Sequence, residues 1–166
     1  MFEHLLVALD GSPAAERVLE HAEALADAFH STITLLQATI SAEMFVAETS
    51  GGDTVVGDVG ATLDPTPVLE ADRAAAADYL NAVAERLRRR NVTVNVEIPP
   101  GPASEVIVER AAALGVTLIL MTTHGRSGLG RVFFGSTADS VLRHATSPVL
   151  LVRITSDDDA NAAAQP

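Results

Sequence analysis

Short apolar runs alternate along the chain with amphipathic stretches. Residues 5–9, 33–38, 118–121 and 149–152 form nearly continuous runs of Val, Ile, Leu, Ala and Met, whereas residues 92–98 alternate between apolar and polar. Runs of this length predict β-strands, and strands that are apolar throughout are typical of a parallel sheet covered on both faces. The alternating stretch predicts a strand nearer an edge.

Helical periodicity separates these runs. After the first run, apolar residues recur at helical spacing, at Val18, Ala22, Leu25 and Phe29. Ser12 and Pro13, just before them, are typical of an N-cap and a first helical position. Three further helices are predicted, one beginning at Thr66-Pro67, one over 104–115 and one from 135 to about 144.

Two segments show no clear period. Residues 40–66 are rich in glycine and contain Gly51-Gly52. A connection this long predicts a flexible loop that is mobile or functional. Residues 155–166 contain three consecutive aspartates and predict an acidic, disordered tail. The folded domain is therefore expected over 1–154.

The order of elements predicts the fold class. Strands separated by helices and joined by right-handed crossovers predict a single α/β domain, with a doubly wound, five-stranded parallel sheet and helices on both faces. Ligands of such sheets bind outside the carboxyl ends of the strands, where the strand order reverses. Asp10 follows the first strand and residues 122–135 follow the fourth. If these strands are neighbours, their loops share one crevice.

Composition excludes several kinds of site. The 166 residues include 22 acidic and 11 basic residues, a formal charge of −11, and no cysteine. Disulfides and cysteine-based metal sites are therefore absent. An acidic surface disfavours nucleic acid, because that affinity comes mainly from cations that neutralise phosphates. No apolar run is long enough to span a membrane. The amino terminus also lacks the basic region of a signal peptide. Together these features predict a cytoplasmic protein.

Every basic residue is arginine, since lysine is absent from the sequence. Acid excess without lysine indicates adaptation to high salt, where self-repulsion is screened. An ordinary acidic protein encoded by GC-rich codons would have a similar composition. An arginine cluster at 86–90 falls at the end of a predicted helix, where cations are favourable neighbours of the helix dipole.

A glycine-rich segment is the main candidate for chemistry. Glycines over 125–130 permit close backbone approach to a ligand, and the helix predicted from Gly135-Ser136-Thr137 offers unpaired N–H groups to an anion. This arrangement is typical of a phosphate site, although glycines also form simple turns and Ser136 can cap its own helix. The lysine-bearing phosphate loop is excluded, and no Gly-x-Gly-x-x-Gly follows the first strand.

Residues 121–129, 135–145 and 147–152 closely resemble the carboxyl half of the universal stress protein family, and residues 5–12 resemble its first strand and loop. ATP-binding members carry Gly, two residues, Gly, nine residues, then Gly-[Ser/Thr]. Gly125, nine intervening residues and Gly135-Ser136 match this pattern. Thr122 stands where those members have the first glycine.

The resemblance implies the strand order 3-2-1-4-5 of the adenine-nucleotide α-hydrolase-like fold and a homodimer formed through the last strand, between Val149 and Val152. It also implies ATP as the ligand, with Mg²⁺ bound through the phosphates. Asp10 would contact the adenosine moiety, the backbone near Ala38 the base, and the glycine loop the ribose and phosphates. The site residues expected from it are Ala8, Asp10, Ala38, Met121, Gly125, Arg126, Gly135, Ser136 and Thr137.

Several of these residues have alternative roles. Asp10 can bind a ribose hydroxyl or cap the following helix, and Arg126 can offset phosphate charge or simply be solvated. His124 is more consistent with a turn-stabilising hydrogen bond than with acid–base chemistry, because no acid or nucleophile is visibly paired with it. The remaining histidines lack the spacing of a metal site.

The expected function is that of an ATP-binding, regulatory homodimer in the stress response, without catalytic residues, although weak ATP hydrolysis stays open. One alternative is a dimer that binds no nucleotide and acts through protein contacts, and Thr122 favours it if its side chain crowds the ligand. An adenylating enzyme is disfavoured, because residues 9–13 offer no Ser-Gly-Gly-type loop.

Overall fold

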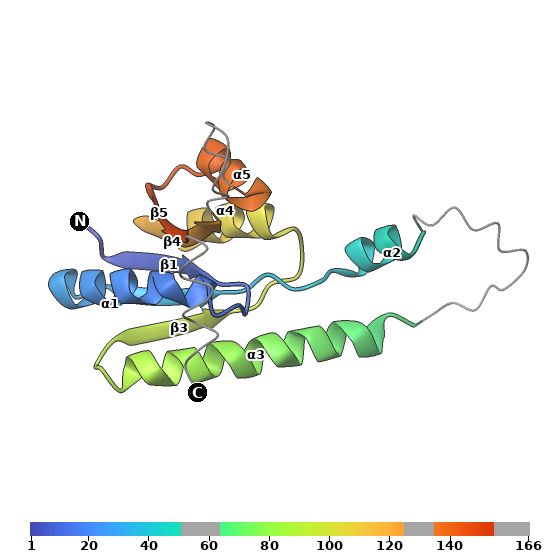
Figure 1. The fold of residues 1–166 in the computed structure, drawn as a ribbon, viewed down its shortest axis with the longest axis horizontal. Coiled ribbons are helices and arrows are strands. Elements are labelled where there is room, and N and C mark those ends of the chain that lie inside the picture. Colours follow the sequence, from blue (N-terminus) through green and yellow to red (C-terminus); the bar gives the residue numbers. More distant parts are fainter. Residues whose placement is uncertain (51–63, 125–134, 155–166) are drawn as a thin grey trace, which may run out of the picture.

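The computed structural model describes residues 1–50, 64–124 and 135–154, with residues 48–50 and 124 described by backbone alone. Its centre is a five-stranded sheet in the order β3-β2-β1-β4-β5, in which every neighbouring pair is parallel (Figure 1). The strands are β1 (His4–Ala8), β2 (Thr32–Leu36), β3 (Thr93–Glu97), β4 (Leu118–His124) and β5 (Val149–Ile154). The predicted fold class and strand order are confirmed.

Helices cover both faces of the sheet. α1 (Val18–Phe29), preceded by the short 3₁₀ turn η1 (Ala15–Arg17), and α3 (Thr66–Arg88) cover one face, while α4 (Ala103–Ala113) and α5 (Ser136–His144) cover the other. A further helix, α2 (Ala42–Ser50), belongs to neither core cluster. Leu5 and Val7 of β1 pack with α1 and α3 in one core cluster, while Leu6 packs with α4 and α5 in the other. Because successive side chains of a strand point to opposite faces, two covered faces require the continuous apolar run of β1.

The two edges of the sheet differ. β3 alternates between exposed and buried positions at its start, which confirms the prediction that residues 92–98 lie near an edge. β5 forms the other edge, and Val149, Leu150, Leu151 and Val152 are all half-buried. An apolar edge of this kind can pair with another strand.

Part of the loop expected over 40–66 is helical. Residues 42–50 form α2, which Figure 1 shows extending away from the sheet. Ser41 begins it, with its Oγ accepting a hydrogen bond from the Met44 N–H at 3.3 Å. The helix lacks a clear apolar period because Met44 and Val46 are exposed rather than packed on the core. Residues 51–63, and the tail expected over 155–166, lie outside the described residues.

The arginine cluster is engaged within the protein. Arg86 pairs with Glu16 and Arg90 with Glu23, which ties the end of α3 to η1 and α1. Arg88 donates to the Val94 carbonyl at 2.8 Å, and so joins α3 to β3. These arginines therefore hold the α3 end against its neighbours. Within the described ranges, no helix combines the length and the apolar character needed to cross a bilayer.

Candidate functional site

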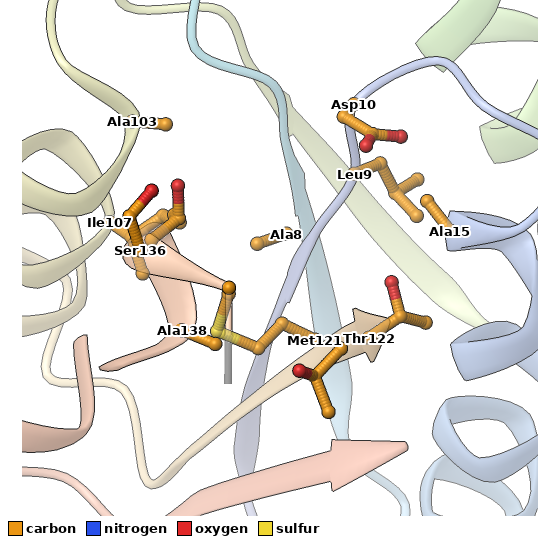
Figure 2. Close-up of a pocket in the computed structure, with 13 residues that line it drawn as sticks. Ala8, Leu9, Asp10, Ala15, Ala103, Ile107, Met121, Thr122, Ser136 and Ala138 are labelled. Atoms are coloured by element: carbon orange, nitrogen blue, oxygen red, sulfur yellow. The ribbon is translucent and has the colours of Figure 1, made fainter. Parts of the chain in front are cut away.

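A pocket of about 250 Å³ opens at the carboxyl ends of β1 and β4 (Figure 2). β1 pairs with β2 on one side and β4 on the other, so this is the point where the strand order reverses. The pocket draws its walls from both strands, from η1, and from the first turns of α4 and α5. Its lining residues are Ala8, Leu9, Asp10, Ala15, Ala103, Ile107, Met121, Thr122, Thr123, Gly135, Ser136, Thr137 and Ala138.

A tight turn after β1 holds Asp10. Gly11 has φ +82°, a left-handed conformation that glycine adopts without a Cβ penalty. This turn brings Ser12 back to the carboxylate, where Asp10 Oδ1 accepts hydrogen bonds from the Ser12 N–H at 2.9 Å and the Ser12 hydroxyl at 2.6 Å. Ser12 Oγ in turn accepts from the Ala15 N–H at 3.1 Å. Ser12 therefore caps the η1 turn rather than α1, which begins six residues later, at Val18.

The amino terminus of α5 forms the opposite wall. Gly135 precedes the helix in an extended conformation with φ −56° and ψ 154°, and no side chain caps it among the described residues. The first backbone bond of the turn runs from the Asp139 N–H to the Gly135 carbonyl at 3.0 Å. The N–H groups of Ser136, Thr137 and Ala138 have no acceptor within the described part of the chain. They present the positive end of the helix dipole to the pocket.

β4 supplies the floor. Met121 belongs to the core cluster on the α4/α5 face. Because side chains alternate along a strand, Thr123 lies on that face as well, and Thr122 is directed toward the other face. Thr122 is half-buried, and Thr123 is only 6% exposed. The Thr123 hydroxyl oxygen is buried and has no hydrogen-bond partner among the described residues.

The start of α4 is a part of the site that the sequence did not predict. Ala103, its first residue, and Ile107, one turn later, line the pocket. They arrive there because α4 crosses from β3, at one edge of the sheet, to β4 near the other. Pro102 before the helix was a local signal of a helix start, but nothing in the local sequence indicates which strands the helix covers.

The structure brings together most of the site residues expected from the sequence. Ala8, Asp10, Met121, Gly135, Ser136 and Thr137 all line this pocket. Ala38 does not line it and packs against the core cluster on the α4/α5 face, just beyond β2. Gly125 and Arg126 lie outside the described residues.

Ala38 nevertheless lies at the same end of the sheet. Its neighbours are tied to β3 and the following turn, through bonds from the Gln37 N–H to the Glu97 carbonyl at 3.2 Å and from the Thr39 N–H to the Pro99 carbonyl at 3.0 Å. The N–H and carbonyl of Ala38 itself have no partner within the described residues. Its backbone thus keeps one donor and one acceptor for a ligand.

Negative charge gathers on the Asp10 side of the pocket. The pKa of Tyr79, on α3, is raised above its usual range by burial, and further by the negative charges of Glu16 and Asp10. The α5 side instead has its own ion pair, since Arg143 lies 2.8 Å from Asp139 and holds the pKa of that carboxyl below its usual value. In the described part of the chain, no three of His, Cys, Asp and Glu gather as a metal site.

The comparison with known proteins decides the family. The universal stress protein family model matches residues 1–153. The chain belongs to the universal stress protein family. Among curated relatives, universal stress protein YxiE of Bacillus subtilis is 28% identical over 92% of this chain and all of its own length. Universal stress protein MJ0531 of Methanocaldococcus jannaschii is 24% identical, over 92% of this chain and 83% of its own.

Solved universal stress proteins share the fold. Universal stress protein UspA from Lactobacillus plantarum superposes with a TM-score of 0.70 at 24% identity, covering 92% of this chain and 98% of its own. A family member from Arabidopsis thaliana with AMP bound superposes with a TM-score of 0.64 at 14% identity, covering 97% of this chain and 98% of its own. A universal stress protein in complex with cAMP superposes with a TM-score of 0.61 at 18% identity, covering 90% of this chain and 95% of its own. These neighbours have the adenine-nucleotide α-hydrolase-like fold.

Proposed function

We propose that this universal stress protein binds an adenine nucleotide, ATP in its physiological state, in the pocket between β1 and β4. It acts as a regulatory homodimer in the stress response rather than as an enzyme. Two neighbours of the same fold have AMP and cAMP bound, which supports the ligand class. The pocket side chains are one carboxylate, four hydroxyls and apolar groups, a set suited to holding a ligand.

One observation carries this proposal, namely that Asp10 and the amino terminus of α5 face one pocket from different sides. In Figure 2, Asp10 and Ser136 stand apart, with Ala8 between them. A carboxylate accepts hydrogen bonds from ribose hydroxyls or an adenine amine and repels phosphate. Free N–H groups at a helix start bind phosphate. The pocket therefore suits a nucleotide whose nucleoside lies toward Asp10 and whose phosphates lie toward α5.

Mg²⁺ enters this proposal with the nucleotide. Magnesium ions prefer oxygen ligands, keep several waters, and are commonly held by substrate phosphates with one or two carboxylates. We propose that the phosphates hold the ion, because Asp10, the carboxylate among the described pocket residues, lies on the nucleoside side. When bound, the ion would neutralise phosphate charge, which matters in a chain of net charge −11. Arg126 and Gly125 complete the proposed phosphate site.

The proposed dimer forms through β5. This strand is an edge of the sheet, and its first four residues are half-buried although each is apolar. Pairing with the same strand of a second copy would satisfy the open backbone groups and cover these side chains. The homodimer thus explains why an edge strand carries apolar residues on both faces.

Calorimetry tests the ligand directly. ATP with Mg²⁺, AMP and cAMP are titrated separately into the purified full-length chain at high salt. We expect saturable heat with at least ATP, at one site per chain. No heat from any of the three at millimolar nucleotide would reject nucleotide binding.

Thr122 favours a second candidate, a dimer that acts through protein contacts alone. Its half-buried side chain lines the pocket where ATP-binding relatives have glycine. A β-branched side chain there narrows the space open to a ligand. If this candidate holds, wild-type protein binds no nucleotide, and Thr122→Gly gains measurable ATP binding. If the wild type binds ATP, and Thr122→Gly changes the affinity by less than about twofold, Thr122 is no barrier.

A further inference from the structure

We propose that the Thr123 hydroxyl is a phosphate-binding group, which donates a hydrogen bond to the nucleotide phosphate beside the amino terminus of α5. This inference rests on the proposed function and adds a residue to it. Glycines and the helix start were expected to bind phosphate from the sequence, but Thr123 was not. It is identified by its burial and its missing partner.

The Thr123 hydroxyl is buried without a partner among the described residues. Thr123 is 6% exposed, and its Oγ1 has no hydrogen bond among the described residues. The other buried threonines and the buried serine on the sheet are bonded, as when Thr34 Oγ1 lies 2.8 Å from His4 Nε2 and Ser31 Oγ donates to the Phe2 carbonyl. Buried polar groups are almost always paired, so an unpaired one needs an explanation.

The position of Thr123 suits contact with a bound phosphate. Thr123 lines the pocket, on the face of the sheet that α4 and α5 cover. Ser136, Thr137 and Ala138 line the same pocket, and their N–H groups lack acceptors within the described residues. Figure 2 shows Ser136 and Ile107 on one side of the pocket and Asp10, Leu9 and Ala15 on the other. The hydroxyl thus lies in the same pocket as these N–H groups, on the face of the sheet that α5 covers.

The chemistry of a phosphate matches a hydroxyl donor. A hydroxyl donates one proton, and a phosphate oxygen is a strong, charged acceptor. With the N–H groups of α5 and the Ser136 hydroxyl, Thr123 makes a cluster of donors without a lysine. Because the sequence contains no lysine, a phosphate site in this chain depends on arginine, backbone N–H groups and hydroxyls. The hydroxyl is therefore unpaired in the free protein and paired when nucleotide binds.

Thr123→Val tests this, because valine keeps the shape and removes the hydroxyl. We expect AMP affinity, measured by calorimetry, to fall about tenfold or more, since hydrogen bonds to charged groups are strong. Adenosine affinity should change by less than about twofold, because adenosine has no phosphate. Equal losses for AMP and adenosine, or no loss for AMP, would overturn the assignment.

Thermal unfolding of the free protein gives a second readout. Thr123→Val removes an unpaired buried hydroxyl and should raise the unfolding midpoint by about 2–4 °C. Thr34→Val, the matched control, removes a paired buried hydroxyl that does not line the pocket. It should lower the midpoint by a similar amount and leave AMP affinity unchanged. A lower midpoint for Thr123→Val would show that the hydroxyl already has a protein partner and would overturn the inference.

Different results would reject nucleotide binding and the role of Thr123. If the wild type binds neither AMP nor adenosine, the proposed function fails and this inference fails with it. If the wild type binds AMP and Thr123→Val binds it equally well, only the role of Thr123 is wrong.

Discussion

One oxygen of the Asp10 carboxylate accepts two hydrogen bonds from Ser12, from its backbone N–H at 2.9 Å and its hydroxyl at 2.6 Å. These bonds fix the orientation of the carboxylate at the end of β1. The second oxygen has no partner among the described residues, although Asp10 lines the pocket. One carboxylate therefore both stabilises the turn and keeps an acceptor for a ligand.

Asp10→Asn separates these two roles. An asparagine keeps the oxygen that Ser12 bonds and loses the charge and the second acceptor. We expect the unfolding midpoint to change little, while calorimetric affinity for AMP and adenosine falls about tenfold or more. Asp27→Asn, on the exposed face of α1, is the charge-matched control and should bind normally. Unchanged affinity in Asp10→Asn would show that Asp10 serves the turn alone.

Gly135→Val tests whether that glycine serves the ligand or the fold. Gly135 has φ −56°, and an added Cβ would meet no atom within 4 Å. We therefore expect unchanged far-ultraviolet circular dichroism and loss of nucleotide binding, because the side chain blocks close approach to α5.

Gly115→Val is the contrasting control. Gly115 ends α4 with φ +61°, which is strained for any side chain with a Cβ. Gly115→Val should lower the unfolding midpoint and leave nucleotide binding intact in the folded protein.

Loss of fold in Gly135→Val would instead make Gly135 a structural residue.

Tyr79 reports on the Asp10 side of the pocket. It is the one tyrosine of the chain, and tryptophan is absent, so phenolate absorbance in the near ultraviolet follows this residue alone. We expect a titration midpoint above the usual value of about 10, because burial and nearby carboxylates disfavour the phenolate. Asp10→Asn should lower the midpoint. A wild-type midpoint at or below 10 would contradict the environment described for Tyr79.

The same pKa shift has a consequence for stability. Since the folded-state pKa is raised, the contribution to stability is fully present below about pH 10 and is lost as the pH rises through the folded value. Chemical denaturation of the wild type should therefore show stability falling above about pH 10. Tyr79→Phe should lack this decline, because phenylalanine has no ionisable hydroxyl.

Leu151→Glu tests the dimer. Leu151 is half-buried on the edge strand β5, where a charge would be desolvated by a second copy. We expect the wild type to elute as a dimer in size exclusion with light scattering, and Leu151→Glu to be a folded monomer. Val68→Glu, at an exposed position of α3, is the control and should remain dimeric. A dimer that survives Leu151→Glu, or a monomeric wild type, would contradict the proposed interface.

Local patterns of apolar residues predict most of the strands and helices. The continuous apolar run at Leu5–Leu9 predicts a strand covered on both faces, and β1 is buried in two separate clusters. The strand order, however, comes from the family resemblance, because local periodicity carries no information on which strands are neighbours. α2 was not predicted, because its sequence has no clear apolar period. The main local sign of a helix there is Ser41, which can cap its first turn.

The sequence predicted the site residues that belong to a recognisable motif. It did not predict those that reach the pocket only through the packing of the folded chain. Asp10 and Gly135-Ser136 lie next to strand and helix ends that the sequence marks. Ala103 and Ile107 reach the pocket only through the crossover of α4, and Thr123 stands out only through its missing partner. Gly125, Arg126 and the adaptation to salt stay predictions.

A crystal structure of the protein grown with ATP and Mg²⁺ tests the central claim most directly. The account predicts nucleotide density in the pocket between β1 and β4, with the ribose or base near Asp10 and phosphate within hydrogen-bond distance of the Ser136 and Thr137 N–H groups. Density for nucleotide only elsewhere, or none in this pocket at millimolar ATP, would contradict it.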